Sequence, residues 1–165
     1  MSPKTHPTRQ PPLASSLSET KGSQKTNRLQ RFLIMQTKEV MTQPAVSVSP
    51  RLTLRELESL FEVYGFNGLP VVEDRHVVGL VTQFDFLKHF VFTPGSVFPH
   101  YEELMKRPVE EIMTREVYTV HPDTPLTRVL QMMVDTRDKS LPVVDDKNRL
   151  IGMISRGDIV RAFRR

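Results

Sequence analysis

The distribution of apolar and polar residues predicts short alternating strands and one-sided helices. Apolar and polar side chains alternate over residues 45–48 and again over residues 117–120, a period of two that predicts a short strand in each place. Downstream of each stretch, apolar residues recur every three or four positions, over residues 54–64 and 126–133. This spacing is typical of a helix that buries one face. Each predicted strand is therefore followed by an amphipathic helix.

Two hairpins and two closing helices complete the pattern. Apolar runs flank a polar turn at residues 73–75 and at residues 145–149, which is the arrangement of a β-hairpin. A last helix is predicted over residues 84–92 in the first case and over residues 157–163 in the second. The order strand, helix, strand, strand, helix thus occurs twice. The sequence predicts an α/β fold built from two β-α-β-β-α motifs.

The two copies are related by an almost constant offset. Matching segments lie 72 residues apart in two cases and 73 residues apart in the third, so the one insertion falls in the turn of the second hairpin, where it is tolerated. Because a half of about 50 residues cannot cover its own apolar faces, we expect the two copies to pack into one domain. The matching segments are residues 40–42 and 112–114, 69–72 and 141–144, and 78–82 and 151–155.

The chain divides into a tail, two motifs and a connector. We place the first motif at residues 35–92, the connector at residues 93–110 and the second motif at residues 111–165. Residues 1–34 are rich in Pro, Ser, Thr and Gln and poor in large apolar residues, a composition that predicts disorder. Residues 1–31 hold six Lys/Arg and one acid and sum to +5; since the whole chain is +4, the rest of the chain sums to −1.

The basic tail leaves two further hypotheses open. It could serve as a nucleic-acid contact or as a targeting peptide, since it is Ser-rich and contains few acids. A nucleic-acid contact through the tail would weaken steeply with ionic strength. The neutral body gives no support to a nucleic-acid surface of its own.

Several classes of function find no support in the sequence. There is no cysteine, so disulfides and thiolate chemistry are excluded, and the five histidines show no metal-ligand spacing. No apolar run approaches the roughly 18 residues of a membrane span, so no membrane partner is expected and we expect a cytoplasmic protein. No nucleophile elbow, phosphate-binding loop or dinucleotide fingerprint is present, and we expect no enzymatic activity.

The ordered set of repeated segments resembles a pair of CBS (cystathionine-beta-synthase) motifs. The resemblance rests on residues 40–41, 69–72 and 79–85, repeated at residues 112–113 and 151–158, and it covers about residues 36–164. It implies two motifs paired about a pseudo-twofold axis in one domain, known as a Bateman module. It also implies a regulatory, non-catalytic protein that binds AMP, ADP, ATP or another adenosyl ligand such as S-adenosylmethionine, and a disk-like homodimer.

The candidate site residues lie where the last strand of each motif meets the last helix. Thr82 and Ser155 stand at this corner, where a hydroxyl and free backbone N–H groups face one point and attract phosphate. Asp85 and Asp158 follow one helical turn later, where a carboxylate can accept hydrogen bonds from two ribose hydroxyls. In the family these residue types play these parts. The resemblance further implies that the adenine lies beside the backbone of Gly68, Leu69 and Pro70 or of Ser140, Leu141 and Pro142.

The same corners also have a purely structural interpretation. A Ser or Thr followed three residues later by an acid is an ordinary helix N-terminal signature, although a capping box prefers Glu or Gln to Asp. The clefts would then be vestigial and the chain would be a dimerisation or partner-binding module for an unidentified regulated protein. Lys139 and Arg156 flank the second corner and could bind phosphate, or could be solvated surface residues; the first corner has Asn67 and Gln83 there.

Overall fold

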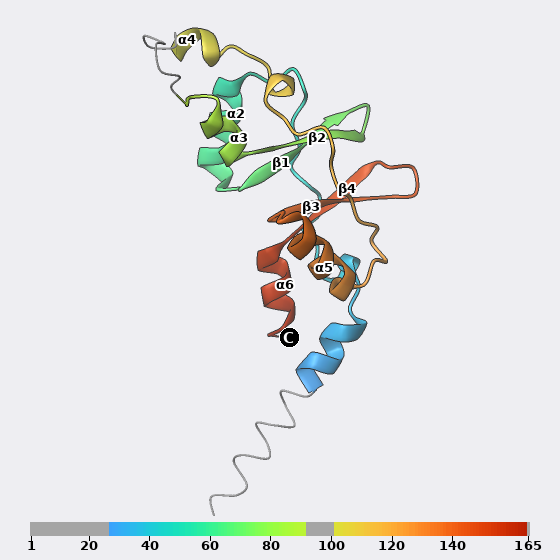
Figure 1. Cartoon of the computed structure of the whole chain (residues 1–165). Helices are drawn as coiled ribbons and strands as arrows, with labels where there is room; N and C mark the ends of the chain where they lie inside the picture. The colour runs from blue at the N-terminus through green and yellow to red at the C-terminus, as the bar shows by residue number, and fades with distance from the viewer. Residues whose placement is uncertain (1–26, 92–100, 165) are drawn as a thin grey trace, which may run out of the picture.

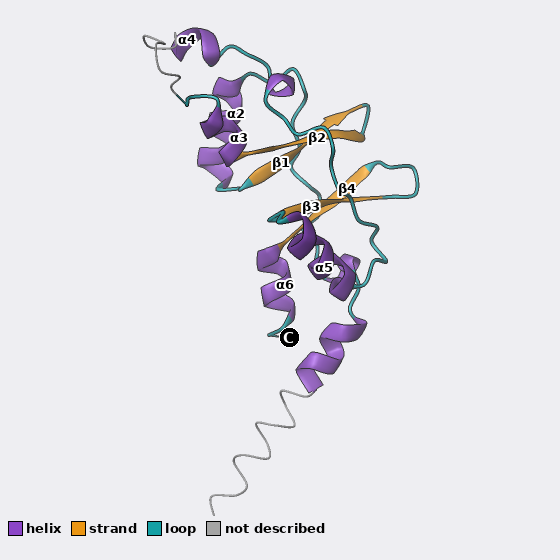
Figure 2. Cartoon of the chain, in the orientation of Figure 1, coloured by secondary structure: helices purple, strands orange, loops and turns teal. Residues whose placement is uncertain are grey.

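The computed structural model describes residues 27–91 and 101–164. Two β-hairpins lie next to each other in the middle of the molecule, with helices on their outer sides (Figures 1 and 2). The α/β fold and its duplicated motif are therefore confirmed. The elements are a helix over residues 27–34, η1 (Thr37–Glu39), α2 (Leu54–Tyr64), β1 (Gly68–Glu73), β2 (His76–Thr82), α3 (Gln83–Lys88), α4 (Tyr101–Leu104), η2 (Val109–Glu111), α5 (Leu126–Thr136), β3 (Ser140–Val144), β4 (Leu150–Ser155) and α6 (Arg156–Ala162).

The two hairpins are antiparallel and closely alike. β1 pairs with β2 so that Gly68 faces Thr82, and β3 pairs with β4 so that Ser140 faces Ser155. The tips of the hairpins meet, because the backbone N–H of Leu150 donates to the Arg75 carbonyl at 3.0 Å. Each corner that holds a candidate site residue therefore lies at the end of a hairpin away from this meeting point.

The first predicted strand of each motif is reduced to a single bridge. Val48 pairs in parallel with Val71 of β1, and Val120 pairs in parallel with Val143 of β3. A longer strand does not form because the chain arrives from the opposite half: Thr42, six residues before Val48, is already paired with β4. The prediction of strands over residues 45–48 and 117–120 is corrected in this respect.

The closing helices α3 and α6 begin at the predicted corners, each one residue earlier than predicted. α3 ends at Lys88 and is shorter than predicted, whereas α6 ends at Ala162 and has the predicted length, shifted by one residue. The longer helices match the amphipathic pattern, and α2 begins with a reciprocal capping box between Thr53 and Glu56. It ends at Tyr64 and is capped by Gly65, whose φ of 63° is the left-handed conformation that glycine adopts without strain.

Each motif buries its own core, but the segment that precedes the other motif completes that core. Met105, Val109 and Met113, which lead into the second motif, are buried against the first hairpin and α2. In the same way, the segment with Met35 and Met41 packs against the core of the second motif. These two crossing segments, residues 35–42 and 105–114, bind the halves into one folded unit.

Backbone pairing fixes the crossing segments to the hairpin of the opposite half. Thr42 exchanges two hydrogen bonds with Met153 of β4 (2.8 and 3.0 Å), and Thr114 exchanges two with Leu80 of β2 (2.8 and 2.9 Å). The glycines repeated in β2 and β4 allow this approach. A Cβ on Gly152 would lie 2.9 Å from the Thr42 carbonyl oxygen, and one on Gly79 would lie 2.5 Å from the Met113 sulfur.

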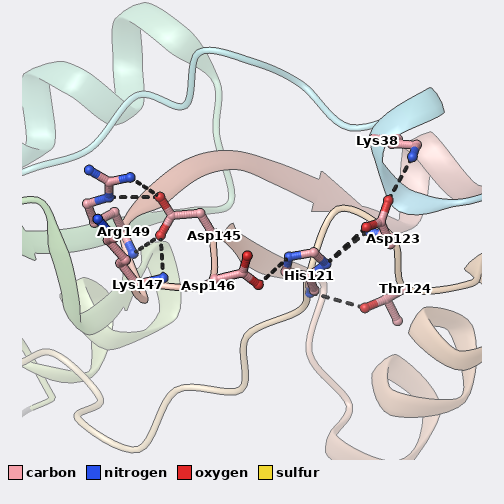
Figure 3. Close-up of polar contacts among 8 residues, drawn as sticks. All are labelled: Lys38, His121, Asp123, Thr124, Asp145, Asp146, Lys147 and Arg149. Atoms are coloured by element: carbon pink, nitrogen blue, oxygen red, sulfur yellow. Dashed lines mark hydrogen bonds and ion pairs between the residues drawn. The ribbon is translucent and has the colours of Figure 1, made fainter.

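Polar contacts hold the first crossing segment in place as well. Lys38 Nζ lies 2.7 Å from the Asp123 carboxylate, and His121 stands between Asp123 (3.6 Å) and Asp146 (3.1 Å) (Figure 3). The hydrogen bond from Lys38 holds the pKa of Asp123 below its usual value. This chain of polar contacts connects the start of the first motif to the turn of the second hairpin.

The predicted disordered tail needs a correction at its C-terminal end. Residues 27–34 form a helix, and Phe32 in it is buried and stacks on Phe163 with ring centroids 3.9 Å apart. The apolar side chain of Phe32 orders this segment because it completes the core of the second motif. Residues 1–26 of the tail and residues 93–100 of the predicted connector lie outside the described residues.

Candidate functional site

The two candidate corners have the same geometry. At the end of β2, the Thr82 backbone N–H and hydroxyl both donate to Asp85 Oδ2, at 3.0 and 2.6 Å. At the end of β4, the Ser155 backbone N–H and hydroxyl both donate to Asp158 Oδ2, at 2.7 Å each. Each aspartate thus forms a reciprocal capping box with the residue that begins its helix. The structural interpretation of these residues is therefore realised.

The capping box leaves the second carboxylate oxygen of each aspartate for another partner. Asp85 Oδ1 lies 3.1 Å from Lys88 Nζ, and Asp158 Oδ1 pairs with Arg161. Both basic side chains are largely exposed, whereas both carboxylates are at least nine-tenths buried. An incoming hydroxyl could replace such an exposed partner without disturbing the cap.

Asp158 borders a small hollow that contains residues from both halves of the molecule. We call it the Asp158 cleft; its cavity volume is about 130 Å³. Its wall is mostly apolar and carries one acid, Asp158, and one base, Lys139. It is lined by Thr42, Pro44, Ala45, Val46, Phe66, Asn67, Gly68, Leu69, Pro70, Lys139, Ser140, Met153 and Asp158.

Asp85 borders a hollow at the related position, which we call the Asp85 cleft. Its cavity volume is about 210 Å³, and three carboxylates line it. None of its lining residues is a lysine or an arginine. The lining residues are Leu80, Thr82, Asp85, Thr114, Glu116, Val117, Tyr118, Asp138 and Leu141.

A third hollow lies between these two clefts, and we call it the central pocket. It has a cavity volume of about 350 Å³ and shares four lining residues with the Asp158 cleft and three with the Asp85 cleft. Arg137 and Lys139 bring two positive charges to it, and Asp138 brings one negative charge. The other lining residues are Asn67, Gly68, Leu80, Thr82, Gln83, Phe84, Leu87 and Ser140.

The structure joins each aspartate to the strand of the opposite motif. Gly68, Leu69 and Pro70 from β1 line the cleft of Asp158, which lies on α6. Leu141 from β3 lines the cleft of Asp85. This exchange follows from the crossing segments, which carry Thr42 to β4 and Thr114 to β2. The repeated segments alone did not indicate which strand accompanies which aspartate.

Some of the remaining predicted site residues line a cleft, and others are engaged in contacts within the fold. Ser140 lines both the Asp158 cleft and the central pocket, and Thr82 lines the Asp85 cleft. Ser155 is held in its capping box with Asp158. The Pro142 carbonyl is engaged, because it accepts a hydrogen bond from the Val120 backbone N–H at 3.0 Å.

The two basic residues predicted near Asp158, Lys139 and Arg156, make different contacts in the structure. Lys139 lines both the Asp158 cleft and the central pocket. Arg156 turns away: its guanidinium donates to the carbonyls of Asp138 (3.0 Å) and Arg137 (2.7 Å). Arg156 therefore fastens α6 to the loop before β3, and the basic residues that line the central pocket are Lys139 and Arg137.

Sequence reasoning missed the residues that give each cleft its character. Phe66 in the Asp158 cleft corresponds to Asp138 in the Asp85 cleft, and Pro44 corresponds to Glu116, each at an offset of 72 residues. A search for repeated residues finds positions that agree and passes over positions that differ. Thr42 and Thr114 carried a signal, since both belong to a repeated segment.

Within residues 27–91 and 101–164, no group of three or more His, Cys, Asp or Glu side chains is arranged to hold a metal ion. No helix in the described part of the chain is both long and apolar enough to cross a membrane.

Solved structures of similar proteins hold adenosyl ligands. The CBS domain pair of protein MJ0100, solved with 5′-methylthioadenosine and S-adenosyl-L-methionine, is 29% identical; the match covers 79% of this chain and 96% of that one, with a TM-score of 0.66. The protein CBSX2, solved with AMP, is 28% identical; the match covers 77% of this chain and 94% of that one, with a TM-score of 0.65.

A curated relative and a family model locate the similarity in the sequence. The L-aspartate semialdehyde sulfurtransferase of Methanocaldococcus jannaschii is 28% identical over 138 residues, which are 83% of this chain and a quarter of that enzyme. The model of the CBS domain matches residues 38–91 and 109–165, one match for each motif. Together with the paired hairpins and crossing segments, these matches show that the chain belongs to the CBS domain family as a tandem pair.

Proposed function

We propose that this chain is a non-catalytic regulatory module that binds an adenosyl ligand of the AMP, ADP or ATP class in the Asp158 cleft. The observation that carries the proposal is the position of the Asp158 carboxylate, buried at the edge of a mostly apolar cleft formed by both halves. An apolar wall suits a flat base, and a carboxylate suits a ribose diol. Similar domain pairs solved with AMP and with S-adenosylmethionine support the ligand class.

The size of the cleft requires the ligand to extend beyond it. Binding sites for small molecules usually measure about 300–1,000 Å³. The Asp158 cleft alone, at about 130 Å³, is smaller, but it adjoins the central pocket of about 350 Å³ through Asn67, Gly68, Lys139 and Ser140. We place the base and ribose in the cleft and the phosphates in the central pocket, beside Lys139 and Arg137.

Calorimetric titration of wild type and Asp158→Ala with adenosine, AMP, ADP and ATP tests this proposal. Loss of a charged hydrogen-bond acceptor is expected to weaken binding by roughly ten- to a hundredfold. The matched control is Glu56→Ala, because Glu56 forms the same kind of capping box with Thr53 and lines none of the three hollows. It should lower the melting temperature and leave binding unchanged. If Asp158→Ala behaves like Glu56→Ala, the aspartate is only a cap.

A second candidate function, self-association, is supported by exposed apolar side chains on the outer helices. Val63 on α2 is 74% exposed, Phe84 and Leu87 on α3 are 68% and 62% exposed, and Val160 on α6 is 53% exposed. We propose that a second copy of the chain covers such side chains in a homodimer. Light scattering on a protein of residues 27–165 should give twice the mass of one such chain at a concentration of tens of micromolar. A monomer at that concentration would contradict the dimer and leave the ligand proposal standing.

A further inference from the structure

The charged residues of the two clefts differ: they balance in the Asp158 cleft and are all acidic in the Asp85 cleft. The Asp158 cleft has one acid and one base among its lining residues, and the Asp85 cleft has three acids and no base. We propose that Glu116 and Asp138 make the Asp85 cleft selective for an adenosyl ligand that carries no phosphate, and favour a positively charged one. The Asp158 cleft is then the site for the phosphorylated ligand. This inference rests on the proposed function and names the ligand class of its second cleft.

Two of the three acids that line the Asp85 cleft lack an ion-pair partner in the described part of the chain. Among the residues that the structure describes, neither Glu116 nor Asp138 forms an ion pair. Asp85 is paired with Lys88, whose amine also lies 5.2 Å from the centre of the Phe84 ring. A neighbouring surface hollow adds one base and one acid, Arg128 and Asp135. A phosphate that enters here meets two carboxylates, and like charges repel in a partly dry site.

The corresponding positions in the Asp158 cleft show that this acidity is not required by the fold. Phe66 and Pro44 occupy the places of Asp138 and Glu116. The ring of Phe66 also stacks on Tyr64, with centroids 5.4 Å apart and an interplanar angle of 3°. One wall is thus aromatic and the other acidic on the same backbone framework.

The basic residues of the central pocket give a second reason to expect that each chain binds only one phosphorylated ligand. Arg137 and Lys139 are its two basic residues, and the pocket borders both clefts. Lys139 also lines the Asp158 cleft, whereas neither basic residue lines the Asp85 cleft. A phosphorylated ligand in the Asp158 cleft takes up this positive charge, and a second phosphate entering from the other side would meet the first.

The experiment is calorimetric titration of the full chain with AMP and with two ligands that differ in charge. S-adenosylmethionine carries a sulfonium, and S-adenosylhomocysteine is its neutral thioether analogue. Wild type is expected to bind one equivalent of AMP, and Asp158→Ala should weaken this binding by roughly ten- to a hundredfold. In the Asp158→Ala background, S-adenosylmethionine should still bind and should bind at least about threefold more tightly than S-adenosylhomocysteine. Asp85→Ala in that background should abolish this binding.

Removal of the two acids should reverse the selectivity. In the Asp158→Ala background, Glu116→Gln with Asp138→Asn should raise AMP affinity at least about tenfold and abolish the preference for the sulfonium. The control is Asp146→Asn, which removes one negative charge from a side chain that is 94% exposed in the second hairpin turn. This control should change neither the AMP affinity nor the preference for the sulfonium.

The outcomes separate this inference from the proposed function. If AMP fills both clefts of the wild type with equal affinity, or if no adenosyl ligand binds Asp158→Ala, the inference fails and the proposed function stands. If wild type binds none of these ligands, the proposed function fails and the inference fails with it.

Discussion

The two motifs of this chain are alike in their corners and unlike in their walls. Asp85 and Asp158 each accept two hydrogen bonds from the residue that begins the helix, and each pairs with a base three residues further on. Yet Phe66 in one wall is replaced by Asp138 in the other. The comparison teaches that the same backbone geometry places a capped aspartate beside a cleft in both halves, while a few wall positions give the two clefts different charges.

The turns of the two hairpins also differ between the motifs. In the first motif, Asp74 and Arg75 have positive φ values of 49° and 70°, as in a two-residue hairpin turn. In the second motif, the longer turn is closed by Asp145, which accepts hydrogen bonds from the backbone of Lys147 and from the backbone and side chain of Arg149 (Figure 3). Asn148 in this longer turn also has a positive φ, 57°, so both turns use the left-handed conformation and the second adds a charged side chain.

The largest expected effect comes from separating the motifs. A fragment of residues 27–91 lacks Met105, Val109 and Met113, which complete its core, and it should show no cooperative unfolding transition. Circular dichroism during heating measures this, with residues 27–165 as the control. A fragment that melts cooperatively as a monomer would show that the halves are independent domains.

The next effect concerns the helix at residues 27–34, whose Phe32 belongs to the core of the second motif. Phe32→Ala should lower the free energy of unfolding by about 3 kcal/mol, because it empties a buried site beside Phe163. Leu33→Ala on the same helix is the matched control, since Leu33 is 54% exposed and should cost little. Urea denaturation measures both. Equal effects of the two substitutions would contradict the packing described for this helix.

A third prediction compares the two glycines against which the crossing segments pack. Gly152→Ala should cost about 1–3 kcal/mol, because its Cβ would press on the Thr42 carbonyl oxygen, which is backbone. Gly79→Ala should cost less, because its nearest contact is the flexible Met113 side chain. Gly157→Ala is the control: it lies in α6 and has open space to 3.4 Å, so it should be neutral or stabilising. Denaturant midpoints rank the three, and a larger loss at Gly79 would contradict the predicted order.

The smallest expected effect is a pH dependence of the second hairpin turn. Hydrogen bonds from Arg149 lower the pKa of Asp145 from 3.8 to about 2. Because the pKa is lowered in the folded state, the stabilisation is present above pH 3.8 and is lost as the pH falls through about 2. The difference in melting temperature between wild type and Asp145→Asn should therefore shrink over this range. Asp74→Asn in the first turn is the control, and a difference that stays constant with pH would refute the assignment.

Much of the fold and part of the site could be predicted from the sequence. Repetition of the Leu-Pro-Val-Val and Gly-containing segments located both hairpins, because a strand needs apolar residues and a turn needs polar ones, and these needs are local. Thr82 with Asp85 and Ser155 with Asp158 were found for the same reason, since a helix N-terminus requires its cap within three residues. The buried contact of Phe32 carried no such signal, because its partner Phe163 lies far along the chain.

The sequence by itself determined the duplication, the hairpins and the two capped corners. Only the tertiary structure decided that the strand of one motif accompanies the aspartate of the other, that Lys139 lines a cleft while Arg156 fastens a loop, and that the two clefts differ in charge. The physical reason is that secondary structure and caps depend on neighbours in sequence, whereas a cleft depends on where the crossing segments bring distant residues together.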